Sequence, residues 1–337
     1  MVKHIDAEVD LQTAGAKRVA VIEIGSRATR LLVADVIRGQ PLITVTTSVD
    51  DTRLMEAAAL SEAAILHELD NIYGIVTRCR ERAIRSNATA VKVFATEAIR
   101  QVRDTNAFRN SRLAASIDQI LDEKAEANCS LISGLTALDR FKLGGDKILV
   151  IDQGAGSMEL ASGKRGPPVE MTEFSGVKLG GNLLLKLFRE NGLDPKAYRA
   201  AALPMLKQCE TLNRDLDRVI VQGTAATKFA WLLVRKSKME KYDPKRVHGA
   251  KLHRKQLEFI VSNVETFSLD KNPKKKWADL QEFINPGEYG GDAAERVVAG
   301  IIPLIHLLTI FHKNEFVVSA YGTRHGMAWR LGQQSMA

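Results

Sequence analysis

The sequence has little cysteine. Its three cysteines, Cys79, Cys129 and Cys209, are far apart and include no C-x-x-C pair. An odd number of scattered cysteines argues against a disulfide framework and against a zinc site of the C-x-x-C type. Free thiols are typical of a reducing compartment, so we expect a cytoplasmic protein.

The signatures of several enzyme classes are also missing. There is no G-x-x-x-x-G-K-[ST], no H-E-x-x-H and no G-x-S-x-G. These absences argue against a Walker-type ATPase, a zincin protease and an α/β-hydrolase. Gly154 and Gly156 lack the third glycine of a dinucleotide fingerprint, which argues against a Rossmann site.

A membrane-spanning run is lacking as well. The longest apolar stretch, 297–311, is interrupted by Gly300, Pro303 and His306 and is too short to cross a bilayer. The first 17 residues carry acids and no apolar core, unlike a signal peptide. We therefore expect no membrane association and a polar tail over 1–17.

Positive charge is what the sequence has in excess. The net charge is +8 and the isoelectric point is near 9.3. This balance favours a polyanionic partner such as polyphosphate, a nucleotide or nucleic acid, although a solvated basic surface gives the same count. The basic clusters at 235–246 and 271–276 have few aromatic neighbours, which argues against a nucleic-acid stacking platform.

The most informative stretch is 148–162, I-L-V-I-D-Q-G-A-G-S-M-E-L-A-S. Two alternating strands with a glycine-rich turn predict a β-hairpin. The N–H groups of such a turn can form a nest that binds phosphate oxygens. The carboxylates of Asp152 and Glu159 flank the turn, and carboxylates beside a phosphate site commonly hold Mg²⁺. A plain structural turn is the alternative.

A shorter version of the pattern occurs near the start of the chain. Apolar residues over 19–24 include one acid, Glu23, and Gly25 and Ser26 precede a second apolar strand over 29–37. Two hairpins of this form suggest paired domains whose turns face each other.

Two other strand ends carry candidate anion contacts. Arg100 follows a strand over 90–95, and ligands gather past such ends in open α/β sheets. Gly223 and Thr224 follow a strand over 219–221 and open a helix, where free N–H groups attract phosphate. A surface ion pair for Arg100 and close packing for Gly223 are the alternatives.

The remaining pattern is that of an α/β chain long enough for two domains. Further strands are expected over 42–47, 120–121 and 316–320. Helices are expected over 61–84 with Ser61 as N-cap, and over 107–117, 123–135, 182–191, 194–212, 256–267 and 293–311, with a last one ending near 332.

Five of these segments occur in the same order in one family. Residues 152–159 (D-Q-G-A-G-S-M-E) are similar to its D-x-G-G-G-S-x-E, and 95–100 (A-T-E-A-I-R) to its A-T-S-A-x-R. Residues 126–127 (E-A), 247–252 (V-H-G-A-K-L) and 322–326 (G-T-R-H-G) match shorter signatures. Over about 18–332 the chain resembles the short form of the exopolyphosphatase / guanosine pentaphosphate phosphohydrolase family, of the acetate kinase, sugar kinase, heat-shock chaperone and actin superfamily.

The resemblance implies an α/β fold of two ribonuclease H-like (actin-like ATPase) domains with a central cleft. Domain I would span 18–135 and domain II 136–337, with the last helix returning to domain I. Members of the family commonly pair, so we expect a homodimer.

The implied activity is release of the terminal phosphate from inorganic polyphosphate with Mg²⁺ (or Mn²⁺). Glu126 falls at the family's catalytic glutamate and would accept a proton from the attacking water; taken alone, it could be an acid favoured by a helix dipole. Asp152, Glu159 and Glu23 would hold the metal. The phosphate-binding residues would be Gly25, Ser26, Arg27, Arg30, Arg100, Gly154, Ala155, Gly156, Ser157, Gly223 and Thr224.

Three departures bear on rate and substrate. Glu23 stands where the family has Asp, Arg27 where it has Asn, and Ala155 where it has Gly. The alternatives are therefore a guanosine pentaphosphate phosphohydrolase, a catalytically weak binder of polyphosphate or alarmone, and a kinase of the same superfamily. The match at Glu126 argues against the kinase, by analogy only.

Overall fold

A computed structural model describes residues 15–37, 40, 42–140, 143–166, 169–238, 240–285 and 291–334. The chain forms two compact units. Unit 1 runs to Ala95 and includes Val102–Ile120 and the chain from Met327 onward, while unit 2 contains Thr96–Gln101 and Leu121–Gly326. Of the tail expected over 1–17, residues 1–14 lie outside the described part of the chain.

Unit 1 is built on a five-stranded sheet in the order β3-β2-β1-β4-β5. Its strands are β1 (Lys17–Ile24), β2 (Ala28–Val36), β3 (Ile43–Asp51), β4 (Ala90–Ala95) and β5 (Gln119–Ile120). Its helices are α1 (Leu54–Ala58), α2 (Glu62–Arg85), α4 (Asn106–Arg109) and the 3-10 turn η1 (Ala114–Ser116), and α3 (Glu97–Val102) enters it at its last residue. The antiparallel pairing of β1 with β2 confirms the first predicted hairpin.

Helix α2 packs against β1, β2 and β4. Its apolar residues recur at helical spacing and are buried, including Ile65, Leu69 and Ile72. The Ser61 hydroxyl accepts the N–H of Ala64, which confirms the predicted N-cap.

Unit 2 contains a six-stranded sheet in the order β10-β11-β9-β6-β7-β8. The strands are β6 (Lys147–Gln153), β7 (Met158–Lys164), β8 (Glu170–Val177), β9 (Arg218–Gly223), β10 (Ala250–His253) and β11 (Glu315–Ser319). The helices are α5 (Glu123–Arg140), α6 (Gly181–Glu190), α7 (Pro195–Ala202), α8 (Thr224–Val234), α9 (Pro244–Val247), α10 (Arg254–Glu265), α11 (Pro273–Ile284) and α12 (Ala293–Ile310), with 3-10 segments η2 (Leu203–Thr211) and η3 (Phe267–Leu269). The last helix, α13 (Thr323–Gln334), has only its start in unit 2.

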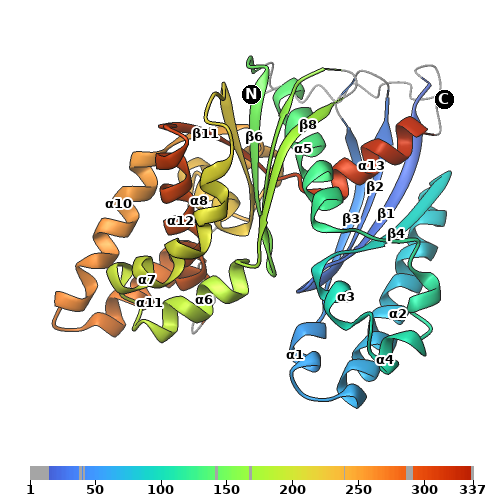
Figure 1. The fold of residues 1–337 in the computed structure, drawn as a ribbon, viewed down its shortest axis with the longest axis horizontal. Helices are drawn as coiled ribbons and strands as arrows, with labels where there is room; N and C mark the ends of the chain where they lie inside the picture. Colours follow the sequence, from blue (N-terminus) through green and yellow to red (C-terminus); the bar gives the residue numbers. More distant parts are fainter. Residues whose placement is uncertain are drawn as a thin grey trace. The chain divides into compact units, whose positions relative to one another are not determined.

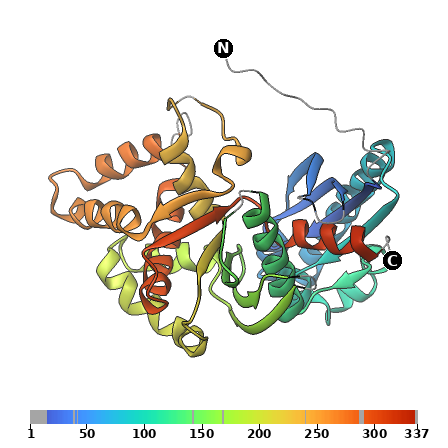
Figure 2. The same cartoon turned by 90° about the horizontal axis from the view of Figure 1, so that it is seen from above.

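The two faces of this sheet carry separate cores. Alternate residues of β6 point to opposite faces, so Ile148 and Val150 pack with α5 while Leu149 and Ile151 pack in the larger core with α6, α8 and α12. Figure 1 shows α5 on one side of the strands and α8 and α12 on the other, and Figure 2 shows the same layers from above. The smaller core, with α5, lies on the face that bears Asp152.

Helix α12 is, among the described residues, the single helix long and apolar enough to span a membrane. However, 67% of it is buried inside unit 2. Its buried residues include Gly300 and Pro303, which interrupt the apolar run in the sequence. This is the pattern of a core helix.

Several expectations were wrong in detail. The helix predicted over 107–117 is the short α4 followed by η1, and the one over 194–212 ends at Ala202 and continues as η2. Pro204, which has no N–H, occupies the first turn of η2. The basic cluster at 271–276 runs into α11, and α1, β8 and β10 were not predicted.

The unit boundary also differs from the one expected after Leu135. Helix α5 packs on β6, β7 and β8 and belongs to unit 2 as a whole. Helix α13 begins in unit 2 and continues in unit 1, where a Cβ on Gly332 would meet the side chain of Val36 at 2.5 Å.

Candidate active site

A row of polar side chains crosses the sheet of unit 2 on the face covered by α5. Asp152 on β6 lies opposite Glu159 on β7 and opposite Gln222 on β9. Directly opposed residues point to the same face of a sheet. Two carboxylates and an amide therefore lie side by side where these strands approach their turns.

Helix α5 presents its own polar residues to this row. Glu126, Ser130 and Ser133 are spaced by four and three residues, which places them on one face of the helix. The Gln222 amide donates to the Ser130 carbonyl at 3.0 Å and to the Ser133 hydroxyl at 2.8 Å. The spacing could have been read from the sequence, but without the partner strand it indicates nothing.

Glu126 is 8% exposed and forms an ion pair with Arg100. The Nη1 of Arg100 lies 2.9 Å from Glu126 Oε2 and also donates to the Leu121 carbonyl at 2.6 Å. Its Nε donates to Glu97 Oε2 at 3.0 Å. The sequence predicts Arg100 as a phosphate contact; the structure gives its guanidinium two carboxylates and a carbonyl as partners.

The carboxylates influence one another. Glu159 is 2% exposed, and burial together with the nearby Glu126 and Asp152 raises its pKa well above the usual range. Burial disfavours the charged form of Arg100, but the charges and hydrogen bonds of Glu126 and Glu97 raise its pKa. Three crowded carboxyl groups thus repel one another when charged, and a bound cation would favour their charged forms.

The turn between β6 and β7 is fastened by its carbonyl groups. The Gly154 oxygen accepts the N–H of Gly181 at 2.8 Å, and the Ala155 oxygen accepts that of Asn182 at 2.9 Å, both at the start of α6. In a trans peptide the N–H points opposite to the C=O. The N–H groups of Ala155 and Gly156 consequently point away from α6, where they can receive an anion.

The strand end at Gly223 lies beside this turn. Gly223 is opposite Gln153 in the parallel pair β6–β9 and has a φ of +108°. A Cβ there would collide with the Gln153 carbonyl. Only glycine suits such a position, and Thr224 then begins α8.

Asp152 is held by two hydroxyl groups that were not among the predicted site residues. Ser130 donates to Asp152 Oδ2, and Thr323 Oγ1 lies 3.0 Å from Ser130 Oγ and 3.5 Å from Asp152 Oδ2. Thr323 lies within the 322–326 motif, but its distance of 171 residues from Asp152 hides the contact in the sequence.

The predicted metal ligands fit a divalent ion in part. Within the residues that the structure describes, no three His, Cys, Asp or Glu side chains form a metal-ligating cluster. Asp152 and Glu159 nevertheless lie together, and the buried Oε1 of Glu159 has no hydrogen-bond partner. Mg²⁺ is usually held by one or two carboxylates, with water and phosphate oxygens completing its shell. The pair therefore suits Mg²⁺.

The other predicted residues lie in unit 1, at the β1–β2 turn. Gly25 donates its N–H to the Ala28 carbonyl at 3.0 Å, which closes the turn. Arg27 is exposed, and Glu23 lies 3.9 Å from Arg30 in an ion pair. The structure thus gathers the predicted residues in two groups, one in each unit.

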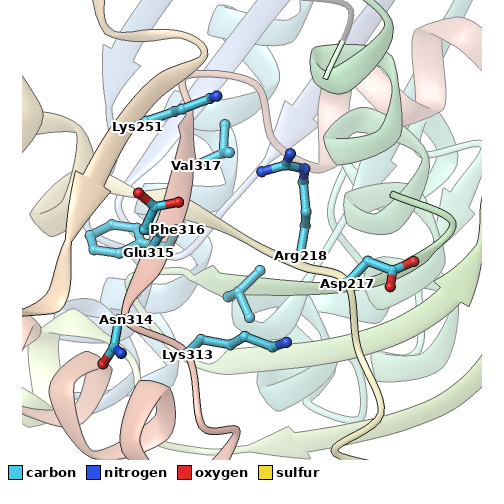
Figure 3. A pocket seen from close by; sticks show the side chains of 9 residues that line it. Asp217, Arg218, Lys251, Lys313, Asn314, Glu315, Phe316 and Val317 are labelled. Atoms are coloured by element: carbon cyan, nitrogen blue, oxygen red, sulfur yellow. The ribbon is translucent and has the colours of Figure 1, made fainter. Parts of the chain in front are cut away.

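A separate groove of about 230 Å³ lies at the other end of β9 and β11 (Figure 3). It is lined by residues that begin these strands, including Arg218 and Glu315, and by Lys251 of β10. None of the predicted site residues lines it.

The comparisons agree with this architecture. Among curated proteins no match is found. A Ppx/GppA family member from Aquifex aeolicus is 22% identical, with a TM-score of 0.77 over 96% of this chain and 99% of that chain. An exopolyphosphatase from Cytophaga hutchinsonii is 17% identical, with a TM-score of 0.69 over 94% and 98%. These similarities show the two-domain actin-like fold.

The sequence model that describes the Ppx/GppA phosphatase family matches residues 32–334, which is most of the chain. The acidic row, the amide-lined turn and Glu126 all lie inside this match. The chain therefore belongs to the Ppx/GppA phosphatase family, whose members hydrolyse phosphoanhydride bonds.

Proposed function

We propose that this protein is a Mg²⁺-dependent exopolyphosphatase that releases terminal phosphate from inorganic polyphosphate. The observation that carries the proposal is the arrangement of Glu126: a carboxylate fixed by Arg100, beside the carboxylates of Asp152 and Glu159. A positioned carboxylate can accept a proton from water, while the paired carboxylates can hold the cation that a polyanion requires.

The turn between β6 and β7 would bind the end of the polyphosphate chain. Its outward N–H groups at Ala155 and Gly156 donate to phosphate oxygens, as in other backbone anion nests. Ala155 in place of glycine leaves these N–H groups in place. Gly223 and Thr224 add the N-terminus of α8 beside the turn. The corresponding role for Gly25, Ser26, Arg27 and Arg30 of unit 1 stays a prediction.

In hydrolysis, a water oxygen forms a bond to the terminal phosphorus while its proton passes to Glu126. The bond between that phosphorus and the bridging oxygen breaks, and the bridging oxygen keeps the electron pair. The products are orthophosphate and a chain shorter by one unit. Such a base contributes about 10²–10⁴-fold to the rate.

Asp152 and Glu159 would hold the divalent ion. When bound, the ion supplies positive charge to the phosphate oxygens as charge builds up on them. Glu23, the third predicted ligand, stays a prediction. Binding of an anion beside these buried carboxylates without a cation would be opposed by like charge.

Arg100 then acts mainly by orienting Glu126. Its Nε and Nη1 donate to Glu97, Glu126 and the Leu121 carbonyl. A phosphate oxygen would have to displace one of these partners before it could contact Arg100. The predicted phosphate contact of Arg100 therefore requires that exchange.

The choice of inorganic polyphosphate over guanosine pentaphosphate stays a prediction. One nearby aromatic ring, that of Tyr321, is not available to stack on a purine. This ring follows β11 and stacks between His248 and His325, with centroids 3.9 Å and 4.1 Å away. Both of its faces are therefore covered, and it offers none to a purine base.

The test is phosphate release from long-chain polyphosphate, guanosine pentaphosphate and ATP, with and without Mg²⁺, in wild type and Glu126→Gln. We expect Mg²⁺-dependent release, fastest from polyphosphate, and a loss of about 10²–10⁴-fold in the variant. Equal rates in the two proteins would remove Glu126 from the mechanism, and tight binding without turnover would favour the binding-protein alternative.

Two further expectations stay predictions. Light scattering of the purified protein would test the homodimer. Cell fractionation would test the cytoplasmic location.

A further inference from the structure

Three rings from two distant motifs form one stack in unit 2. The rings of His248 and Tyr321 are 3.9 Å apart between centroids and inclined by 28°, and those of Tyr321 and His325 are 4.1 Å apart and inclined by 9°. His248 belongs to the 247–252 motif and His325 to the 322–326 motif. Neither histidine has a role in the hydrolysis described above.

Hydrogen bonds fasten the stack to the turn after β11. The Ala320 N–H donates to His248 Nδ1 at 3.2 Å, and the Gly322 N–H donates to His325 Nδ1 at 3.2 Å. Each Nδ1 accepts and so carries no proton. Burial, together with the charge of Arg324, lowers the pKa of His325 well below its usual range, which keeps this ring neutral. Both imidazoles thus act as rigid acceptors for the turn backbone.

The far end of the same turn is pressed against α5. A Cβ on Gly326 would collide with the Cys129 carbonyl, which precedes Ser130. Rings on one side and the α5 backbone on the other therefore fix the segment 320–326. Thr323 lies in the middle of this segment.

Thr323 connects the turn to the metal-binding pair. The single hydroxyl proton of Ser130 is donated to Asp152 Oδ2, so Ser130 can only accept in its 3.0 Å contact with Thr323. Thr323 Oγ1 also reaches Asp152 Oδ2 directly, at 3.5 Å, so its one proton goes to Ser130 or to Asp152. In both arrangements the two hydroxyl groups orient the Asp152 carboxylate.

We propose that His248, Tyr321 and His325 are positioning residues that set the metal-binding carboxylate of Asp152 through Thr323 and Ser130. The inference rests on the proposed function for the role of Asp152. Residues that orient metal ligands typically affect metal affinity by about 10–100-fold when they are replaced. The stack would thus tune cation binding without touching the cation or the substrate.

The test is direct Mn²⁺ binding, measured by electron paramagnetic resonance without substrate. We expect Tyr321→Ala to weaken Mn²⁺ binding about tenfold and Tyr321→Phe, which keeps both ring faces, to change it less than about twofold. Tyr73→Ala is the matched control, because Tyr73 lies in α2 of unit 1 and its ring is covered by the guanidinium of Arg112, 4.7 Å from the ring centroid. A loss in Tyr73→Ala equal to that in Tyr321→Ala would overturn the proposal.

A double-mutant cycle decides whether the effect passes through Thr323. In Thr323→Val, which removes the hydroxyl and keeps the shape, the further change Tyr321→Ala should weaken Mn²⁺ binding by less than about twofold. Additive losses would overturn the proposal, as would wild type that binds no Mn²⁺.

A second pair of variants covers the possibility that Tyr321→Ala does not fold. His325→Asn keeps an acceptor near the Nδ1 position and loses the ring, whereas His325→Phe keeps a ring and loses the acceptor. Each should weaken Mn²⁺ binding, and wild-type affinity in both would overturn the proposal. Because the readout is metal binding, a failure to hydrolyse polyphosphate would overturn the proposed function and leave this inference standing.

Discussion

Arg100 Nη1 lies 2.9 Å from Glu126 Oε2, and both groups are largely buried. The ion pair joins the segment after β4 to the first turn of α5. A bidentate or shared guanidinium holds a carboxylate in one orientation better than a point charge does. The orientation of the proposed base therefore depends on an arginine that follows a different strand.

Replacing Arg100 by methionine tests this dependence. Because the arginine orients Glu126, we expect kcat to fall by about 10²-fold while KM for polyphosphate changes little. Steady-state kinetics separate the two constants. A large rise in KM with kcat preserved would show instead that Arg100 acts as a direct phosphate contact.

Glu97 competes for the same guanidinium. It lies 2.8 Å from Arg100 Nη2 and 3.9 Å from Lys178 Nζ. Glu97→Gln removes a negative charge beside the phosphate-binding region, so we expect KM for polyphosphate to fall about fivefold because like-charge repulsion is reduced. Glu173→Gln, the same change at an acid of β8, serves as the control, and an unchanged KM in Glu97→Gln would contradict the expectation.

Glu159 gives the metal-free protein a pH dependence of stability. Its pKa is raised in the folded state above its ordinary value of 4.5 by burial and by Glu126 and Asp152. A group whose pKa is higher in the folded than in the unfolded protein stabilises the fold at pH values below the unfolded pKa. This contribution to the free energy of unfolding is lost as pH rises through the folded pKa.

We therefore expect Glu159→Gln to match wild type in acid and to exceed it at alkaline pH by about 1 kcal/mol or more in the free energy of unfolding. Urea denaturation in EDTA, at about pH 5 and pH 8, measures the difference. Added Mg²⁺ should restore the wild type. A difference that does not change with pH would show that Glu159 does not titrate as described.

Two adjacent glycines test the amide-lined turn. A Cβ on Gly180 would collide with the backbone of Gly156 and Ser157, whereas a Cβ on Gly181 would meet the Gly154 oxygen at an ordinary 3.7 Å. We expect Gly180→Ala to shift the turn and to lower kcat/KM for polyphosphate by about 10²-fold. Gly181→Ala should retain wild-type kinetics. Equal kcat/KM values in the two variants would show that the turn does not bind phosphate.

The sequence by itself determined the hairpins and much of the acidic pair. A glycine-rich turn at 154–157 makes Gln153 and Met158 neighbours, and alternation then places Asp152 opposite Glu159. The spacing of apolar residues likewise predicted α2, and Ser61 its start. These features depend on local geometry, which residues close in sequence specify.

Local patterns were insufficient where side chains compete with the helix. Thr105 caps α4, but Ser111 donates to the Phe108 carbonyl just past its end, and the chain turns instead of continuing to 117. Pro204 changes the path after Ala202 in a similar way. In each case the apolar periodicity continues although the backbone hydrogen bonds do not.

Only the tertiary structure decided how the acids are held. Ser130 and Thr323 meet at Asp152 although 193 residues separate them, and Arg100 takes Glu97 and Glu126 as partners rather than solvent. Such contacts depend on which face of α5 lies on the sheet and on where the chain turns after β11. Packing settles both choices, because burying a charge or hydroxyl is tolerated only where another buried group can pair with it.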